Sequence, residues 1–447
     1  MRVAVIGGGL GGLAAARALV AAGVDAHVLE ASGRAGGVLA TTRDGGFTRE
    51  HAATAFVGGP PRGALALCGE LGVPVERAAK AAKRRWVFVD GALRELPRGP
   101  LALARSDLLT WRGKLDLVRE PLRPSRAADG DESVHAFAAR RLGAEAARAF
   151  VAPMVTGVFA ADSHDISLAA GFPRLAALDA AGGIVRGAVA TIVRGAIARV
   201  RGRSDPRTPR GLYAPVGGLG ALVDALVASL GGRVRTGAFV RELAPANGGV
   251  IIDGERWDGA VLALAADLAS ALVVDAIPEL AARLDAFDRA PIAIVFLGFA
   301  ADAVARARDG FGFLVAHGED VRVLGCVFES TVWPDRAPVG QALVRCIYGG
   351  GRDPDAAALA PAELIALARR DLAIALGVEG EPVHASVVVH ERGIAQYRVG
   401  HRDRVREAET CARAYRVAIA GADYRGPAVN DLCADAAVVA EEVAAWR

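Results

Sequence analysis

The sequence predicts a protein of mixed α/β and α+β class, in which a parallel-sheet domain is interrupted by two inserted blocks. Two observations suggest the parallel-sheet domain: the chain opens with a strand, a glycine-rich turn and a helix, and it closes with another strand–loop–helix unit. A third is that residues 216–266 return to the same style, with a helix followed by short strands. A chain of 447 residues is long enough for two or three domains, so the segments between these regions form the inserted blocks.

The opening unit carries a dinucleotide-binding pattern. Residues 2–6 form a short apolar run that suits a buried parallel strand, and Gly7, Gly9 and Gly12 follow in G-x-G-x-x-G spacing. The first glycine makes the turn, the second admits a pyrophosphate to the backbone, and the third lets helix and strand pack. The helix N-terminus offers N–H groups to the phosphates, and Glu30, at the end of the second strand, can accept hydrogen bonds from a ribose. The pattern predicts a Rossmann-like domain; a purely structural glycine loop is the alternative.

Two further segments favour FAD over a nicotinamide cofactor. Arg34 and the glycine pair ending at Gly37 follow Glu30, and they resemble the R-x-G-G segment that lines the second side of the pyrophosphate in FAD-dependent oxidases and desaturases. Near the end of the chain, a strand and a loop lead into a helix that begins at about Ala428. In such flavoproteins the N-terminus of this helix, with a partial charge of about +0.5, faces the pyrimidine ring of the flavin. These motifs contain no Cys or His that could attach a flavin, so we expect noncovalent FAD.

The two inserted blocks differ in character. The first is rich in helical patterns, whereas the second contains apolar runs typical of strands. Residues 184–203 of the first block suit a helix at a membrane surface, because an apolar arc lies beside several arginines; a packed helix with a solvated basic edge explains the pattern equally well. The predicted domains are a discontinuous FAD-binding domain at 1–60, 211–265 and 411–447, a mixed-sheet substrate-binding domain at 61–95 and 266–410, and a helical, membrane-associating domain at 96–210.

Composition and charge exclude several classes of protein. There are 53 Lys and Arg residues against 50 Asp and Glu, so the formal net charge of +3 indicates no nucleic-acid partner. The five cysteines lack C-x-x-C spacing and the eight histidines lack metal-ligand spacing, which predicts reduced thiols, a cytoplasmic location and no metal site. The longest apolar runs are too short or too interrupted to span a bilayer.

Eight segments spread over nearly the whole chain form a more specific pattern: VIGGGLGGLAAA, RAGG, AAKRRWVF, TGVFAADSHDIS, PIAIVFLGF, DGFGFLV, GIAQYRVGH and PAVNDL. Together they resemble the bacterial oxygen-dependent protoporphyrinogen oxidases, FAD enzymes of the amine oxidase and desaturase superfamily. The resemblance implies oxidation of protoporphyrinogen IX to protoporphyrin IX in haem biosynthesis. It implies three two-electron steps, with dioxygen as the acceptor and hydrogen peroxide as its product. Peripheral contact with the cytoplasmic face of a membrane is also implied, and a homodimer is left open.

The family's site residues carry over onto defined positions of this chain. Arg85 matches a position near a propionate, and its planar guanidinium suits a carboxylate; a surface arginine at the start of a strand is the alternative. The other predicted substrate-binding residues are Thr54, Phe311, Leu314 and Ile347. The predicted cofactor-binding residues are Gly7, Gly9, Gly12, Glu30, Arg34, Gly37, Val38, Ala53, Val240, Gly421, Pro427, Ala428 and Val429. The flavin accepts the hydride, so we name no catalytic acid or base.

The sequence departs from the family pattern next to the expected flavin site. Ala52 and Ala53 stand where Gly-Pro is usual, and Thr54 stands where some members have an arginine that binds a propionate. These changes bear on the substrate more than on the cofactor. Coproporphyrinogen III is therefore an alternative substrate, and a diverged amine-oxidase-like enzyme or a non-catalytic flavin- or porphyrin-binding protein are further alternatives. Release of hydrogen peroxide with protoporphyrinogen distinguishes an oxidase from a carrier.

The segment DGFGFLV raises a geometric problem. In a regular strand, Phe311 and Phe313 would share one face and Leu314 would lie on the other, so Phe311 and Leu314 could not contact one ligand. Gly310 and Gly312 permit backbone angles that turn the chain. We therefore predict that Phe311 and Leu314 contact the substrate, whereas Phe313 belongs to the core.

Overall fold

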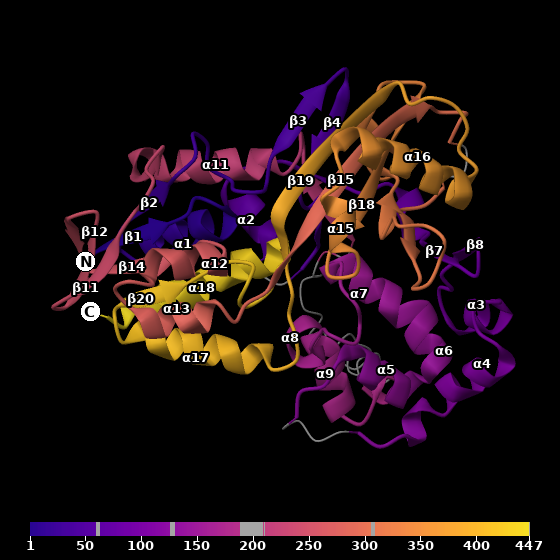
Figure 1. Ribbon diagram of the computed structural model, residues 1–447, viewed down its shortest axis with the longest axis horizontal. Helices are drawn as coiled ribbons and strands as arrows, with labels where there is room; N and C mark the ends of the chain where they lie inside the picture. Colours follow the sequence, from indigo (N-terminus) through magenta and orange to yellow (C-terminus); the bar gives the residue numbers. More distant parts are fainter. Residues whose placement is uncertain (60–62, 126–129, 188–208, 210, 305–308, 447) are drawn as a thin grey trace, which may run out of the picture.

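The computed structural model describes residues 1–59, 63–125, 130–187, 209, 211–304 and 309–446. A five-stranded parallel sheet with its helices forms one half of the molecule, and a seven-stranded mixed sheet with a group of helices forms the other (Figure 1). Both chain termini lie at the outer end of the parallel-sheet half (Figure 1). The predicted class, with a Rossmann-like domain and a mixed-sheet domain, is confirmed.

All strands of the first sheet are parallel, in the order β10-β2-β1-β14-β20. They are β1 (Arg2–Ile6), β2 (Asp25–Glu30), β10 (Val234–Thr236), β14 (Gly259–Leu262) and β20 (Val417–Ile419). One face is covered by α1 (Leu10–Ala21), α11 (Gly220–Leu230) and α18 (Val429–Ala444). The other face is covered by α12 (Ala266–Val273), α13 (Pro278–Leu284) and α17 (His401–Arg413). The central strands β1 and β14 are short and mostly apolar, as expected in a parallel sheet that is buried on both faces.

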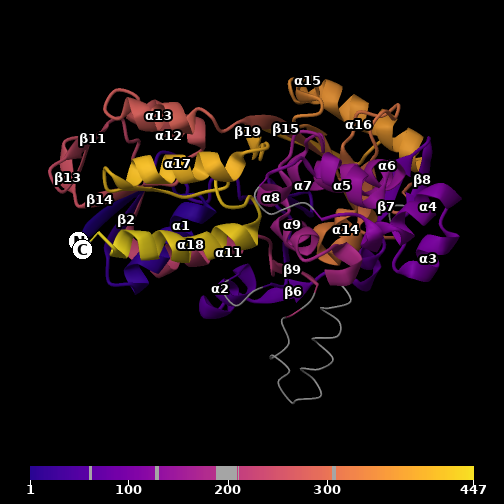
Figure 2. The ribbon, with the colours of Figure 1, turned by 90° about the horizontal axis from the view of Figure 1, so that it is seen from below.

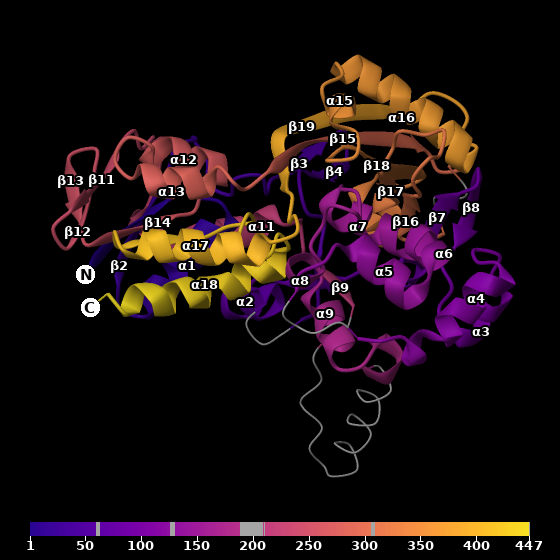
Figure 3. The ribbon, with the colours of Figure 1, turned by 60° about the horizontal axis from the view of Figure 1, so that its bottom comes forward.

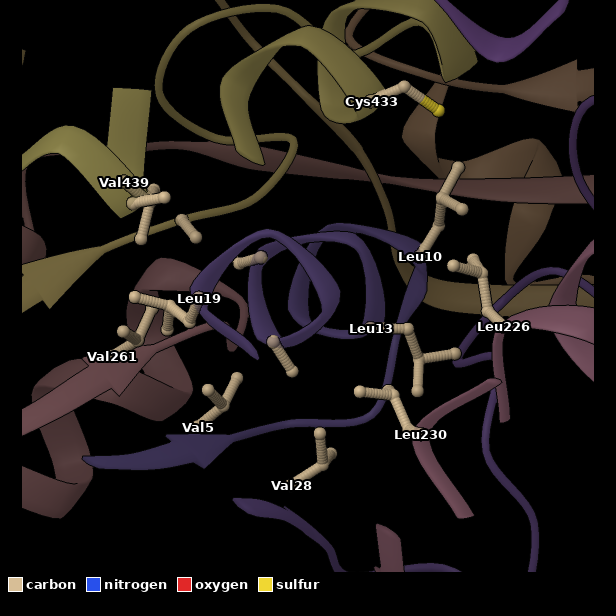
Figure 4. Close-up of a cluster of buried hydrophobic side chains, with 14 of the residues drawn as sticks. Val5, Leu10, Leu13, Leu19, Val28, Leu226, Leu230, Val261, Cys433 and Val439 are labelled. Atoms are coloured by element: carbon tan, nitrogen blue, oxygen red, sulfur yellow. The ribbon is translucent and has the colours of Figure 1, made fainter. Parts of the chain in front are cut away.

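The core between this sheet and α1 fixes the helix that opens the cofactor site. Val5, Val28 and Val261 of the sheet and Leu13 and Leu19 of α1 belong to one cluster (Figure 4). All five side chains are fully buried. Burying each such side chain contributes about 1.5–3 kcal/mol, so the first turn of α1 is held firmly at the carboxyl edge of the sheet.

Residues 266–284 pack against the parallel sheet, whereas the predicted domain division assigned 266–410 to the substrate-binding domain. Helices α12 and α13 pack in one cluster with Ala4, Ile6 and Leu262 of the parallel sheet. Helix α17 joins the same cluster and begins at His401, before the expected boundary at 411. The physical reason is that the second face of the parallel sheet must also be buried, and these three helices bury it.

Smaller elements surround the parallel-sheet domain. An antiparallel three-stranded sheet consists of β11 (Leu243–Ala246), β12 (Gly249–Ile252) and β13 (Glu255–Trp257). A hairpin is formed by β3 (Thr41–Asp44) and β4 (Phe47–Glu50). A second three-stranded sheet has the order β5-β9-β6, with β5 (Phe56–Val57), β9 (Leu212–Pro215) and β6 (Val75–Arg77), and α2 (Ala64–Glu70) lies between β5 and β6 in the chain.

The mixed sheet has the strand order β19-β15-β18-β17-β16-β7-β8. Its strands are β7 (Trp86–Val89), β8 (Ala92–Glu95), β15 (Arg289–Ala300), β16 (Gly312–Val315), β17 (Gly325–Val327), β18 (Gln341–Gly349) and β19 (His384–Ala395). All neighbours are antiparallel except β16 and β7, which are parallel. Helix α16 (Pro361–Leu376) packs on one side of this sheet, and the helical group lies on the other (Figure 3). The shorter helices α14 (Glu329–Val332) and α15 (Pro354–Ala357) connect its strands.

The helical group lies in the segment predicted to be a helical domain, and Figure 2 shows it beside the end of α18. It contains α3 (Pro100–Arg105), α4 (Trp111–Val118), α5 (Val134–Leu142), α6 (Ala144–Ala146), α7 (Ala152–Phe159), α8 (Leu168–Gly171) and α9 (Pro173–Ala180). Of the segment predicted as a membrane-surface helix, residues 188–203 lie outside the described residues. Among the helices that are described, none combines the length and the apolarity needed to cross a bilayer.

Candidate active site

The glycine-rich turn forms a cradle at the N-terminus of α1. Gly7 has φ +107°, and a Cβ there would overlap the carbonyl group of Ala263 on the neighbouring strand end. A Cβ on Gly12 would overlap the carbonyl oxygen of Gly7, so helix and strand approach closely at this point. At Gly9, in contrast, no described atom lies within 4 Å of a built Cβ. No described side chain caps α1 at Gly9, and the space beside this residue is open, so the cradle fits a pyrophosphate.

Glu30 and Arg34 organise the loop that faces the cradle. The Glu30 carboxylate accepts hydrogen bonds from the backbone N–H of Gly8 at 2.7 Å and of Ser32 at 2.8 Å. The Arg34 guanidinium donates to the carbonyl oxygen of Gly37 at 2.7 Å, so this side chain braces its own loop. A Cβ on Gly37 would lie 3.2 Å from the Cα of Gly9, which places the two predicted glycine motifs side by side.

The other predicted cofactor residues lie at two further edges. Val38, in the same loop as Gly37, is 46% exposed. Val240 packs at the margin of the core that α12, α13 and α17 form on the second face of the sheet. Gly421 follows β20, and a Cβ on Gly11 of the cradle would lie 3.4 Å from its Cα. The loop after β20 therefore meets the first turn of α1.

The N-terminus of α18 is held beside the same region. Pro427 precedes the helix, Ala428 is its N-cap residue, and Val429, the first helical residue, is buried. The side chain of Asn430 donates to the carbonyl oxygen of Val57 at 2.7 Å and accepts from the N–H of Ala64 at 2.9 Å. These bonds join the first turn of α18 to β5 and α2. The positive end of the helix dipole is thus fixed in direction, as expected for a helix that faces a flavin.

The loop between β20 and α18 is held by side chains that the sequence analysis did not single out. The Tyr397 hydroxyl donates to the carbonyl oxygen of Ala422 and accepts from the N–H of Gly426, both at 2.7 Å. Asp423 accepts from Arg289 of β15 and is 1% exposed. Burial raises the pKa of the Asp423 carboxyl, and Arg289 opposes that effect. The loop is therefore rigidly attached to both sheets.

Thr54 occupies a different environment from the one that the family resemblance suggested. Its hydroxyl donates to Glu329 at 3.1 Å and accepts a hydrogen bond from Arg336. Both partners are buried, and Glu50 lies next to Arg336. Burial raises the pKa of Glu50, and the Arg336 guanidinium opposes that effect. The Thr54 hydroxyl thus belongs to a buried charged network rather than to an open surface.

Predicted substrate contacts come together on one face of the mixed sheet. Leu314, Gly325 and Ile347 are directly opposite one another on β16, β17 and β18. Residues opposite in register share a face, and these three lie on the face turned away from α16. A Cβ on Gly325 would lie 2.9 Å from Cδ2 of Leu314, so the Leu314 side chain covers the glycine that separates it from Ile347. Helix α7 approaches here, since a Cβ on Gly157 would lie 3.0 Å from both Cδ atoms of Leu314.

Phe311 joins this face because the chain turns before β16. Gly310 and Gly312 have φ of +128° and +147°, so the predicted turn at the two glycines is confirmed. Phe313 is 2% exposed and packs in the core beneath α16, as predicted. Phe311 is half-buried and packs in a separate cluster with Val327, which shares the face of Leu314.

Arg85 lies at the edge of this apolar face. The Cζ atom of its guanidinium is 5.4 Å from the centroid of the Phe311 ring. The neighbouring Arg84 is held by Glu95 and Asp309, whereas no described acidic side chain pairs with Arg85. The exposed Arg85 guanidinium is therefore available to a carboxylate on a ligand that contacts Phe311.

The fold and this pair of adjoining regions define a flavin-dependent oxidoreductase. The chain belongs to the flavin containing amine oxidoreductases, whose sequence profile matches residues 10–433. The FAD cofactor and the enzyme class predicted from the sequence are thereby confirmed. When bound, FAD accepts a hydride equivalent from a substrate; the cradle at Gly9, the loop braced by Arg34 and the first turn of α18 are the parts that would hold it.

Individual relatives narrow the similarity further. Human protoporphyrinogen oxidase is 32% identical over 480 residues, which cover 96% of this chain and 95% of the human one. Coproporphyrinogen III oxidase of Bacillus subtilis (strain 168) is 26% identical over 460 residues, covering 97% and 95% of the two chains. A crystal structure of a candidate protoporphyrinogen oxidase from Exiguobacterium sp. 255-15 superposes with a TM-score of 0.84 at 23% identity, covering 100% and 99%. The predicted resemblance to porphyrinogen oxidases is confirmed.

Proposed function

We propose that this chain oxidises protoporphyrinogen IX to protoporphyrin IX in three two-electron steps, with dioxygen as the acceptor and hydrogen peroxide as its product. The observation that carries the proposal is the placement of Arg85 over Phe311, at the edge of the face that bears Leu314 and Ile347. This combination suits an apolar macrocycle with carboxylates at its rim. The human relative, which is 32% identical to this chain, is a protoporphyrinogen oxidase.

In this proposal the protein acts mainly by binding and orienting the macrocycle. Arg85 binds a propionate through paired N–H donors, which fixes the rotation of the ring. Phe311, Leu314 and Ile347 supply apolar contact and exclude water from the face of the macrocycle. Holding the substrate in one orientation toward the flavin supplies much of the rate enhancement in reactions of this kind.

The test is steady-state turnover of the purified holoenzyme in air. With protoporphyrinogen IX, porphyrin fluorescence and hydrogen peroxide should rise together, with about three peroxides for each porphyrin, as three two-electron steps require. Substrate added without oxygen should bleach the flavin absorbance. Tight binding of the porphyrinogen without bleaching or peroxide would instead identify a carrier and would reject the proposal.

Coproporphyrinogen III is the second candidate substrate, because the Bacillus subtilis relative is named coproporphyrinogen III oxidase and aligns over nearly the whole chain. The two substrates differ in the number of propionates, and therefore in the number of cationic partners that they need. The ratio of kcat/KM for protoporphyrinogen to that for coproporphyrinogen decides between them. An amine substrate that gave more peroxide than either porphyrinogen would favour the amine-oxidase-like alternative.

We further propose peripheral contact with an anionic membrane surface through the helical group. Trp111, Leu115, Val118 and Leu122, spaced four, three and four apart, are 69%, 37%, 73% and 82% exposed. Trp111, Leu115 and Val118 share one side of α4, and Leu122 lies in the short 3-10 turn Glu120–Leu122 that follows it. Exposed basic side chains accompany the stripe: Arg105, Arg112 and Arg119. Such a surface is typical of helices that lie in a membrane interface.

Vesicle flotation tests this contact. The holoenzyme should float with vesicles that contain anionic lipid, and Trp111→Ser with Leu115→Ser should abolish flotation while leaving turnover of dispersed substrate unchanged. A protein that never floats, or a double variant that floats as well as the parent, would reject the surface. The cytoplasmic location and the homodimer stay predictions.

A further inference from the structure

A charged network is buried between the two halves of the site. Glu50, Glu329, Arg336 and Arg345 are only 1%, 1%, 2% and 6% exposed. Arg336 forms an ion pair with Glu329 and lies 3.6 Å from Glu50, measured from Nη2 to Oε1. Arg345 lies 3.8 Å from Glu329, measured from Nη1 to Oε1. Two acids and two bases thus balance one another, although they come from β4, α14, the turn Pro334–Arg336 and β18.

Both arginines also donate hydrogen bonds to the backbone of segment 51–54, in which Ala52 and Ala53 stand where the family usually has Gly-Pro. Arg345 donates to the carbonyl oxygen of Ala52. Arg336 donates to the carbonyl oxygen of Thr54 at 3.1 Å, in addition to its contact with the Thr54 hydroxyl. A single side chain thereby fixes both the main chain and the side chain of one residue.

A third hydrogen bond holds the backbone of His51, the residue before Ala52. His390 of β19 donates from Nε2 to the carbonyl oxygen of His51 at 2.7 Å. Carbonyl groups of 51, 52 and 54 therefore face side chains from the mixed sheet and from the turn beside it. In the opposite direction, Ala52 and Ala53 pack at the margin of the core that contains Leu10 and Val429, the first residues of α1 and α18. The segment lies between the charged network and the cofactor cradle.

The energetics of the network point to a geometric role rather than a stabilising one. Desolvating four charges is costly, and buried ion pairs contribute little net stability compared with well-packed apolar side chains. This network is not even fully satisfied: Glu329 Oε1 and Arg345 Nε have no hydrogen-bond partner among the described residues. Burial also lowers the pKa of the Arg345 guanidinium, and Glu329 opposes that effect. The contribution that apolar side chains could not replace is the set of N–H donors by which the two arginines bind particular carbonyl oxygens.

We infer that Arg336 and Arg345 are positioning residues that hold segment 51–54 against the bound FAD. Arg345 acts from the substrate-binding sheet and Arg336 from the turn Pro334–Arg336, and both act on the backbone beside the cofactor cradle, so they couple the two domains at the active site. The inference depends on FAD binding and not on which porphyrinogen is oxidised. It assigns the two arginines no contact with substrate.

The decisive experiment compares two buried arginines in different places. Arg345→Met removes the donors to Ala52, and Arg345→Lys keeps the charge but loses the planar fork. The matched control is Arg141→Met, because Arg141 is fully buried and pairs with Glu120 and Asp179 within the helical group. For each holoenzyme, FAD release on dilution gives the Kd, the visible flavin spectrum and the rate of sulfite addition report on the surroundings of the ring, and calorimetry gives the Tm.

Arg345→Met should raise the Kd for FAD at least tenfold and alter the flavin spectrum, and Arg345→Lys should do so about threefold to tenfold. Arg141→Met should lower the Tm and leave the Kd, the spectrum and the sulfite rate within twofold of the parent. If Arg345→Met does not fold, Arg345→Lys carries the test alone. An unchanged Kd and spectrum in Arg345→Lys, or equal flavin changes in Arg141→Met at an equal loss of Tm, would overturn the inference.

Discussion

The two phenylalanines of DGFGFLV should fail in different ways when each is replaced by alanine. The ring of Phe313 is 2% exposed and lies 6.3 Å from that of Phe328, between ring centroids, in the core beneath α16. Removing a buried ring costs about 3–5 kcal/mol, through lost transfer free energy and the cavity left behind. For a domain of this size, that cost lowers the Tm by roughly 10 °C. The KM of Phe313→Ala should stay close to that of the parent.

Phe311→Ala should show the opposite balance. The ring is only half-buried, so its loss should cost about 1–2 kcal/mol of stability. Its KM for protoporphyrinogen should rise roughly tenfold, because a ring–macrocycle contact and the apolar area beside it are lost. Calorimetry of both variants gives the Tm, and porphyrin fluorescence gives the KM. If Phe311→Ala lost as much Tm as Phe313→Ala and kept its KM, the residue would be only a strand end.

Four other substitutions test the site. Gly9→Val should abolish FAD binding, because its side chain enters the space kept open for the pyrophosphate; the purified variant would be colourless. Arg85→Ala should raise the KM for protoporphyrinogen roughly tenfold to hundredfold with an unchanged flavin spectrum. The family pattern suggests that Thr54→Arg should tighten substrate binding. We expect instead that it weakens FAD binding, because the new side chain adds a cation next to Arg336. Burial lowers the pKa of His401 from 6.5 to about 4, so between these pH values only the unfolded chain binds a proton at this residue. The free energy of unfolding should therefore fall by up to about 3 kcal/mol as the pH drops from 6.5 to about 4. His401→Gln should remove this part of the pH dependence.

Each of these has an outcome that contradicts it. A yellow Gly9→Val protein would show that the pyrophosphate lies elsewhere. Arg85→Lys is the control for Arg85, since it should recover only part of the affinity; an unchanged KM in Arg85→Ala would remove Arg85 from the substrate site. Tighter substrate binding in Thr54→Arg would mean that the side chain reaches the substrate after all. Parallel plots of Tm against pH for the parent and His401→Gln would show that His401 does not titrate differently on unfolding.

The cofactor site could be predicted from the sequence because its determinants are local. Gly7, Gly9 and Gly12 lie within one turn: a Cβ on Gly12 would overlap the carbonyl oxygen of Gly7, and the space beside Gly9 is open. Glu30 follows within the next strand, so spacing alone brings it to the same edge. The helix at the end of the chain obeys the same rule, because parallel strands end at a common edge.

The supports of the site could not be predicted, because their partners are far apart in the sequence. Tyr397 donates to Ala422, 25 residues later, and Arg345 donates to Ala52 across 293 residues. The segment GIAQYRVGH, which contains Tyr397, carries the family resemblance, but it does not indicate which loop the Tyr397 hydroxyl holds. An arginine in an apolar strand such as ALVRCIYGG indicates a buried charge, yet the pattern does not identify the carbonyl group that it contacts.

The domain division differed for a related reason. The sequence predicts strands in the second block and assigns no helices to 266–284, so it does not indicate which sheet these helices cover. Helices α12 and α13 follow β14 directly, so the shortest connection returns them to the parallel sheet and not to the mixed sheet further along the chain. The demand of a parallel sheet for cover on both faces was the argument that would have assigned them correctly.

The altered turn at Ala52 and Ala53 and the buried arginines are best understood together. A Gly-Pro turn limits its own backbone, since proline fixes φ and needs no outside support. Two alanines impose no such limit, so the same path requires external hydrogen bonds, and Arg345 and Arg336 donate them. Thr54 then has a reason to be small and hydroxylic: a larger cation would compete with Arg336 for Glu329. The loss of a propionate-binding arginine at this position therefore follows from how the turn is held, and it is weak evidence against a porphyrinogen substrate.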